Sequence, residues 1–167
     1  MAKPEWFNKL PLAPIEYATK RYGLDFNLVC AIIQHESGGV PFKTRYEAHT
    51  DKYVMHPRDY ASKLGISAET ETVAQKHSYG LMQLMGYCAR ELSFDDYLVK
   101  LCNPEIGLEF SCRKLKKIFQ WSLVREESDA IAAWNWGNPA KDKTGMYKAQ
   151  HYLNKVNALL YELRKPD

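Results

Sequence analysis

The segment Phe26-Asn-Leu-Val-Cys-Ala-Ile-Ile-Gln-His-Glu36 is almost wholly apolar, and the chain breaks directly after it at Ser37-Gly38-Gly39. At helical spacing, Glu36 continues the apolar stripe that contains Val29 and Ile32. The pattern therefore predicts a buried helix whose last turn carries a carboxyl group. That helix is the natural starting point for a mainly helical fold.

The position of Glu36 suggests a chemical role. Burial penalises the charged form of a carboxyl group and raises its pKa, and the negative end of a helix acts in the same direction. A carboxyl group that stays protonated near neutral pH can serve as a general acid. The ordinary alternative is a glutamate that reaches solvent or pairs with a cation. The pair His35-Glu36 does not extend to a zinc-binding His-Glu-x-x-His motif, because position 39 is glycine. We expect no metal and no cofactor.

The composition is that of one soluble globular domain, which we expect to cover residues 1–167. Hydrophobic residues make up 46% and charged residues 26% of the chain. The net charge of +3 is too small to argue for a nucleic-acid partner. The four cysteines show no C-x-x-C spacing, which favours buried thiols. The N-terminal stretch lacks a basic start followed by a long apolar run, so we expect no secretory signal and no membrane insertion.

Apolar periodicity and capping residues predict helices along most of the chain. Gly23 ends the first helix, Asp25 caps the second, Asn103 precedes a proline-led start, and Ser128 or Asp129 caps the helix that Gly137 stops. The expected helices cover residues 13–22, 26 to 36 or 37, 80–92, 104–119, 130–136 and 147–163.

Residues from about 40 to 78 differ from the rest of the chain, because they are polar and contain two prolines. We interpret this segment as an insertion loop between helices, with an extended or hairpin-like stretch at 42–54 and a short helix near 59–64. The predicted fold class is therefore mainly α, with a small β element after the helix that carries Glu36.

Three further strings carry polar residues in apolar surroundings. They are Gly80-Leu-Met-Gln83, expected at the start of a helix, Ala133-Trp-Asn135-Trp-Gly137, and Tyr152-Leu-Asn-Lys-Val156. Taken singly, Gln83 could be a helix-surface glutamine, Asn135 a C-cap and Tyr152 a core tyrosine.

Taken in order with Glu36-Ser37-Gly38, the three strings resemble the four successive motifs of the lytic transglycosylases. This is the soluble-lytic-transglycosylase-like catalytic domain, related to goose-type lysozyme, and the resemblance covers residues 15 to 163. It implies a lysozyme-like α-helical fold. It also implies cleavage of the β-1,4 bond between N-acetylmuramic acid and N-acetylglucosamine in peptidoglycan.

The resemblance implies a role for each matching residue. Glu36 would protonate the glycosidic oxygen and then act as base toward the muramyl 6-hydroxyl, giving a 1,6-anhydro product. The substrate's own acetamido group would stabilise the cationic intermediate, and Ser37 would orient that group. Gln83 and Asn135 would hydrogen-bond the sugars. Tyr152 would hydrogen-bond the catalytic carboxyl group and hold its orientation.

Apolar residues near these motifs would keep Glu36 protonated, as burial does in other glycosidases. Ile33, Met82, Met85 and Trp134 would form that surround, and Met82 and Trp134 are also expected substrate-binding residues. The family's third motif usually carries tyrosine at the position of Trp134, so a hydroxyl contact made there would be lost.

The insertion leaves a second chemistry open. Its string Arg45-Tyr46-Glu47-Ala48-His49 looks like the Arg-aromatic-Glu string of some phage and goose-type relatives. Glu47, Asp51 or Asp59 could then be a second catalytic carboxylate that activates water, across a gap of about 6.5–9.5 Å in an inverting enzyme. Each could instead be a solvated or ion-paired loop acid, and this is the favoured interpretation for Asp51 and Asp59.

Three functional readings follow. The first is a phage-type transglycosylase for lysis or cell-wall penetration, delivered by the phage or released by a holin. A bacterial envelope enzyme without its signal is the other route, and virion or secretion-machine components are candidate partners. The second is a hydrolytic goose-type muramidase on the same scaffold. The third is a non-catalytic wall-binding or virion structural module, against which a desolvated acid such as Glu36 argues.

Overall fold

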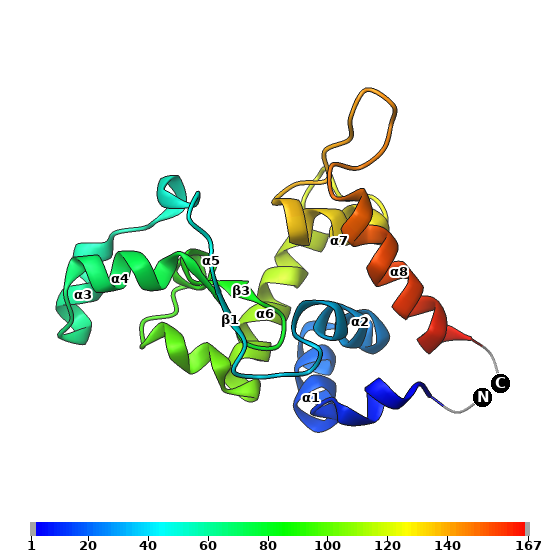
Figure 1. Cartoon of the computed structure of the whole chain (residues 1–167), viewed down its shortest axis with the longest axis horizontal. Helices are drawn as coiled ribbons and strands as arrows, with labels where there is room; N and C mark the ends of the chain where they lie inside the picture. Colours follow the sequence, from blue (N-terminus) through cyan, green and yellow to red (C-terminus); the bar gives the residue numbers. More distant parts are fainter. Residues whose placement is uncertain (1–2, 166–167) are drawn as a thin grey trace. The chain divides into compact units, whose positions relative to one another are not determined.

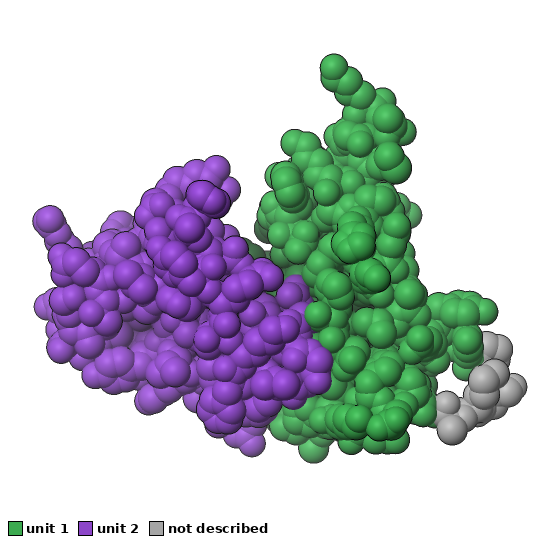
Figure 2. Space-filling model, viewed as in Figure 1, with its two compact units in different colours: residues 1–35, 112–167 green, residues 36–111 purple. Residues whose placement is uncertain are grey.

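The computed structural model describes residues 3–165 and confirms a mainly helical fold with a small antiparallel sheet. The chain forms two compact units, shown in Figure 2: unit 1 comprises residues 1–35 and 112–167, and unit 2 comprises residues 36–111. The division falls inside two helices, α2 (Phe26–Ser37) and α6 (Pro104–Phe119), so each of these helices contributes residues to both units. Within residues 3–165, no helix has the length and apolar character that crossing a membrane requires.

Unit 1 is helical (Figure 1). Besides its parts of α2 and α6, it contains η1 (Glu5–Lys9), α1 (Leu12–Tyr22), α7 (Glu127–Trp136) and α8 (Gln150–Arg164).

The predicted boundaries at the end of α1 and at the starts of α2 and α6 are confirmed. Gly23 adopts a left-handed conformation with φ of 60° and ends α1. Asp25 caps α2, because its Oδ1 accepts a hydrogen bond from the backbone nitrogen of Leu28 at 2.7 Å. The Asn103 side chain caps α6 by accepting from the backbone nitrogen of Glu105 at 3.0 Å.

The predicted start of α7 is wrong by two to three residues. Glu126 is the N-cap, and Asp129 completes a capping box by accepting from the Glu126 backbone nitrogen at 3.2 Å. Asp129 also accepts from the Tyr147 hydroxyl at 2.8 Å. Tyr147 pairs with Lys141 in an isolated β-bridge, so α8 begins at Gln150 and not at Tyr147.

The core of unit 1 includes the apolar face of α2. Val29, Ile32 and Ile33 are fully buried, as the sequence predicts. On the inward face of α8, Leu159 is half-buried and four further residues are buried. The buried four are Tyr152, Val156, Leu160 and Leu163.

Unit 2 combines short helices with the sheet (Figure 1). Its elements are β1 (Thr44–Tyr46), η2 (Asp51–Tyr53), α3 (Pro57–Leu64), α4 (Ala68–Gln75), β2 (His77–Tyr79), β3 (Leu84–Met85), α5 (Gly86–Glu91), η3 (Leu98–Cys102) and the first turns of α6. The antiparallel strand order is β1-β2-β3, with Arg45 opposite Ser78 and Tyr79 opposite Leu84. The helix near 59–64 is confirmed as α3, whereas the stretch at 42–54 is a strand only over β1 and includes the 3-10 helix η2. Helix α4, capped by Ser67, was not predicted.

The predicted helix over residues 80–92 is wrong for its first half. Gly80 to Gln83 form the turn between β2 and β3, and only α5 is helical. The left-handed φ angles of Gly80 (74°) and Gln83 (52°) are incompatible with a right-handed helix. The turn packs so closely that a Cβ on residue 80 would overlap the carbonyl oxygen of Leu101. Tertiary contact therefore overrides the apolar periodicity here.

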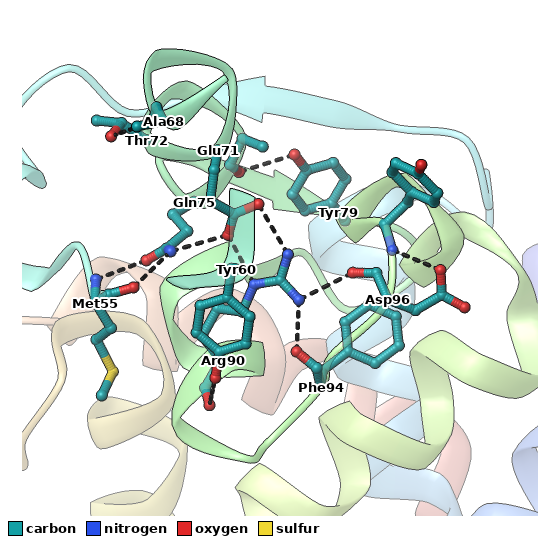
Figure 3. Close-up of polar contacts among 12 residues, drawn as sticks. Met55, Tyr60, Ala68, Glu71, Thr72, Gln75, Tyr79, Arg90, Phe94 and Asp96 are labelled. Carbon is teal, nitrogen blue, oxygen red and sulfur yellow. Dashed lines mark hydrogen bonds and ion pairs between the residues drawn. The ribbon is translucent and has the colours of Figure 1, made fainter. Parts of the chain in front are cut away.

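Unit 2 contains a buried ion pair between Arg90 and Glu71 (Figure 3). The side chains of Arg90 and Glu71 are 0% and 1% exposed, and two hydrogen bonds of 2.7 and 2.9 Å join them. Arg90 also donates to the carbonyl oxygens of Phe94 and Asp96 and stacks over the ring of Tyr60. A buried charge pair is tolerated when its remaining donors are satisfied in this way.

Gln75 extends the network of Glu71 to the loop that precedes α3 (Figure 3). Its Nε2 donates to Glu71 at 2.9 Å and to the carbonyl oxygen of Met55 at 2.8 Å. Its Oε1 accepts from the backbone nitrogen of Met55 at 2.7 Å. The buried amide of Gln75 thereby bonds both the backbone N–H and the backbone C=O group of Met55, as a neighbouring β-strand would, and fixes the end of this loop.

Candidate active site

Glu36 lies in the last turn of α2 and is half-buried. The helix stops beyond it because Gly38 and Gly39 take left-handed φ angles of 64° and 83°. The backbone carbonyl oxygen of Glu36 accepts a hydrogen bond of 2.7 Å from Nζ of Lys43. The helix end that carries the candidate acid therefore has the ammonium group of Lys43 as a hydrogen-bond partner.

Ser37, the next residue, is buried, with 5% of its surface exposed. Its Oγ accepts from the backbone nitrogen of Gly39 at 3.2 Å, and its carbonyl oxygen accepts from Val40 at 3.3 Å. Both contacts tighten the turn after α2. The hydroxyl proton of Ser37 takes no part in the Gly39 contact, where the oxygen is the acceptor.

Gln83 is buried in the turn between β2 and β3, with 8% of its surface exposed. Its Nε2 donates to the carbonyl oxygens of Lys43 at 2.8 Å and Gly80 at 2.9 Å. Its Oε1 accepts from Oγ of Ser78 at 2.9 Å. Both amide N–H groups are thus engaged within the protein, which leaves Oε1 as the part of the amide able to accept a further hydrogen bond. Met82 beside it is 1% exposed.

The expected site residues of unit 1 lie on α7 and α8. Tyr152 is buried, and its ring packs edge-on against His35, with centroids 4.8 Å apart. His35 directly precedes Glu36 on α2. Trp134 is half-buried against a small apolar cluster, whereas Asn135 is exposed near the end of α7. Asn135 is not the C-cap, because Gly137 takes that position.

Each of the three candidate second carboxylates of the insertion has a basic side chain beside it. Glu47 accepts from Nε of Arg45, and its side chain is 33% exposed. Asp51, 73% exposed, pairs with Lys76 at 2.7 Å, and that hydrogen bond holds the pKa of Asp51 below its usual range. The third acid, 81% exposed, is Asp59, whose Oδ2 lies 3.8 Å from Nδ1 of His56. Asp51 and Asp59 thus have the surroundings of solvated surface acids.

Two residues of this region carry no signal in the sequence. Lys43 and Ser78 fall in polar stretches of the insertion and belong to no recognisable motif. Their importance appears only in the folded chain, where they contact Glu36 and Gln83. Within residues 3–165, no group of three or more His, Cys, Asp or Glu side chains is arranged to hold a metal ion.

The family described as the transglycosylase SLT domain matches residues 13–156 of the chain, and the protein belongs to that family. It is accordingly a peptidoglycan lytic transglycosylase, an enzyme that cleaves the glycan strands of the cell wall. A search of curated proteins finds no match.

Proposed function

We propose that Glu36 is the single acid and base of this enzyme and that the reaction yields 1,6-anhydro-N-acetylmuramic acid ends. The observation that carries the proposal is the position of Glu36, half-buried at the end of the apolar face of α2. An oxocarbenium-like transition state needs an acid at the leaving oxygen, and partial burial favours the protonated form of a carboxyl group.

The reaction balances with this one carboxyl group. Its proton passes to the glycosidic oxygen while the bond from that oxygen to C1 of the muramyl residue breaks. The substrate's acetamido group stabilises the cation at C1. The muramyl 6-hydroxyl then bonds to C1 and returns a proton to the carboxylate of Glu36. No water is consumed, so the fragment that carries the new muramyl end is one water lighter than its hydrolytic counterpart, whereas the fragment released by the leaving oxygen is the same in both reactions.

The surroundings of the insertion acids support transglycosylation over hydrolysis. A hydrolase of the inverting type needs a second carboxylate to activate water. Glu47 is engaged by Arg45, while Asp51 and Asp59 are largely exposed and close to Lys76 and His56. For Asp51, the hydrogen bond from Lys76 lowers the pKa of the carboxyl group and makes it a weaker base.

The other expected site residues have supporting roles in this proposal. Tyr152 contributes to the orientation of the catalytic group, in keeping with its packing against His35. Asn135, which is exposed, binds sugar, and Trp134 and Ser37 assist in substrate binding. Gln83 contacts sugar through Oε1, because its N–H groups are engaged. Met82 shapes the site from a buried position.

The test is digestion of purified peptidoglycan followed by mass spectrometry of the products. We expect products with anhydro ends. Glu36→Gln should lower the rate by a factor of about 10² to 10⁴, the usual contribution of a general acid. Glu5→Gln is the matched control, because Glu5 is an exposed acid paired with Lys9.

Two results would count against the proposal. Reducing ends that require a water, together with loss of activity in Glu47→Gln, would establish hydrolysis with Glu47 as the second carboxylate. Full activity in a folded Glu36→Gln variant would remove Glu36 from the mechanism.

A further inference from the structure

Both the side chain and the main chain of Lys43 form hydrogen bonds with residues of the candidate site in unit 2. Its Nζ donates to the carbonyl oxygen of Glu36 at 2.7 Å. Its own carbonyl oxygen accepts from Nε2 of Gln83 at 2.8 Å and from the backbone nitrogen of Gly80 at 2.9 Å. Lys43 therefore connects the turn that carries Gln83 to the end of the helix that carries Glu36.

The turn of residues 80–83, which binds the carbonyl oxygen of Lys43, contains an unfavourable backbone conformation. Gln83 has a φ of 52°, in the left-handed region that non-glycine residues rarely occupy. Such residues persist where the surrounding structure compensates, and they concentrate at functional sites. Here the compensation is the set of amide hydrogen bonds, and the Oγ of Ser78 fixes which way the amide points.

The ammonium group of Lys43 meets a physical need of α2. The last carbonyl groups of a helix have no partner inside the helix, and cations satisfy them and oppose the negative end of the dipole. The helix ends within one residue of Glu36, so fraying of its last turn would move the carboxyl group. A displacement of about 1 Å in a catalytic group can cost about 100-fold in rate.

We propose that Lys43 is a positioning residue for Glu36. Gln83 contributes to the same positioning, because its amide binds the backbone carbonyl group of Lys43. The inference rests on the proposed function of Glu36, and it assigns to Gln83 a structural task besides any contact with sugar. The ammonium group acts through the main chain of Glu36 and takes no proton in the reaction.

The experiment compares Lys43→Met, which keeps length and loses the charge, with Lys43→Arg, which keeps a donor. Lys20→Met is the matched control, because Lys20 is an exposed lysine that pairs with Glu16 on the same helix. We expect Lys43→Met to lower kcat by about 10- to 100-fold with little change in KM, because positioning and not substrate affinity is lost. Lys43→Arg should recover most of kcat, and Lys20→Met should match the wild-type enzyme.

The link to Gln83 is tested by a double-mutant cycle. If the two residues hold one arrangement, Lys43→Met combined with Gln83→Leu should cost no more in kcat than the larger single effect. Losses that multiply would show independent roles and would overturn the link.

A second readout does not depend on activity. Backbone amide exchange in the last turn of α2 should quicken in Lys43→Met and stay unchanged in Lys20→Met. Unchanged exchange and unchanged kcat in Lys43→Met would overturn the inference while leaving Glu36 in place. A loss of kcat that Lys43→Arg does not restore, with an equal loss of thermal stability, would also overturn it. If the wild-type enzyme releases no product, the proposed function fails, and the exchange data still decide whether Lys43 holds the helix end.

Discussion

Both units contain a bidentate pair between an arginine and a glutamate, but the two pairs differ in burial. In unit 2 the side chains of Arg90 and Glu71 are 0% and 1% exposed. In unit 1 Arg164 contacts Glu127 at 2.7 and 2.8 Å, and these side chains are 39% and 35% exposed. The same chemical pair thus serves as an interior element in one unit and as a surface contact in the other.

The difference reflects how each unit is built. Unit 1 buries long apolar faces of helices, exemplified by Val29 and Ile32 of α2. Unit 2 consists of shorter helices and strands of two or three residues, which bring fewer apolar side chains to a common core. A buried polar network supplies specific contacts between its elements. We therefore expect unit 2 to be the more sensitive to single polar substitutions.

The largest expected effect is in the buried pair. Arg90→Met should lower the free energy of unfolding by about 3–5 kcal/mol, because it leaves the carboxylate of Glu71 buried without its partner. Urea denaturation measures the change. If Arg90→Met does not fold, Glu71→Gln provides the same test with a smaller perturbation. A loss below 1 kcal/mol in either variant would show that the buried pair is no more important than a surface one.

The second-largest loss of stability is expected from a glycine substitution in the turn between β2 and β3. Gly80→Ala combines a left-handed φ with overlap of the new Cβ and the carbonyl oxygen of Leu101, and should cost about 2–3 kcal/mol. Gly65→Ala is the matched control. Gly65 has a φ of 66°, and a Cβ there meets no described atom within 4 Å, so about 1 kcal/mol is expected. Equal losses in thermal unfolding would show that the close approach at Leu101 is unimportant.

The contribution of the unit 1 core to the free energy of unfolding should depend on pH. Burial raises the pKa of the Cys30 thiol from 9.0 to about 12. Because the folded state favours the protonated thiol, its contribution is fully present below pH 9 and is lost as the pH rises toward 12. The free energy of unfolding should fall by about 1.4 kcal/mol per pH unit in this range. Denaturation at pH 8 and pH 10 measures it, and Cys30→Ala should have the shallower pH dependence. Parallel curves for the two proteins would contradict the assignment.

The smallest effect is expected at the exposed pair of unit 1. Arg164→Met should change the free energy of unfolding by less than about 1 kcal/mol, because solvent screens the charges and replaces the lost hydrogen bonds. The measurement is urea denaturation alongside Arg90→Met. Equal losses in the two variants would remove the distinction between the units.

The sequence predicted those features that depend on near neighbours in the chain. Asp25 and Asn103 cap helices because each side chain reaches a backbone nitrogen two or three residues ahead. Gly23 and Gly137 end helices because each can take the left-handed conformation. The family motifs likewise lie in short continuous strings, which made the enzyme class recognisable. Delivery by a phage and association with virion or secretion components remain predictions.

Other features depend on residues that meet only in the fold. The string Gly80 to Gln83 has helical spacing of apolar residues, yet it forms a turn because it packs on Leu101 and holds Lys43. The role of Arg90 is equally hidden, since its partner Glu71 is nineteen residues away in the chain.

The stripe of α2 and its terminal Glu36 could be read directly from residue order, because helical periodicity and glycine conformation are local properties. The contacts around Glu36 could not. Strand pairing brings distant segments of the chain together. Because of this, Lys43 contacts the end of α2, and Gln83 donates both of its amide N–H groups to backbone carbonyl oxygens. Local sequence thus pointed to Glu36 as the candidate acid, whereas long-range packing decided which residues contact the end of its helix.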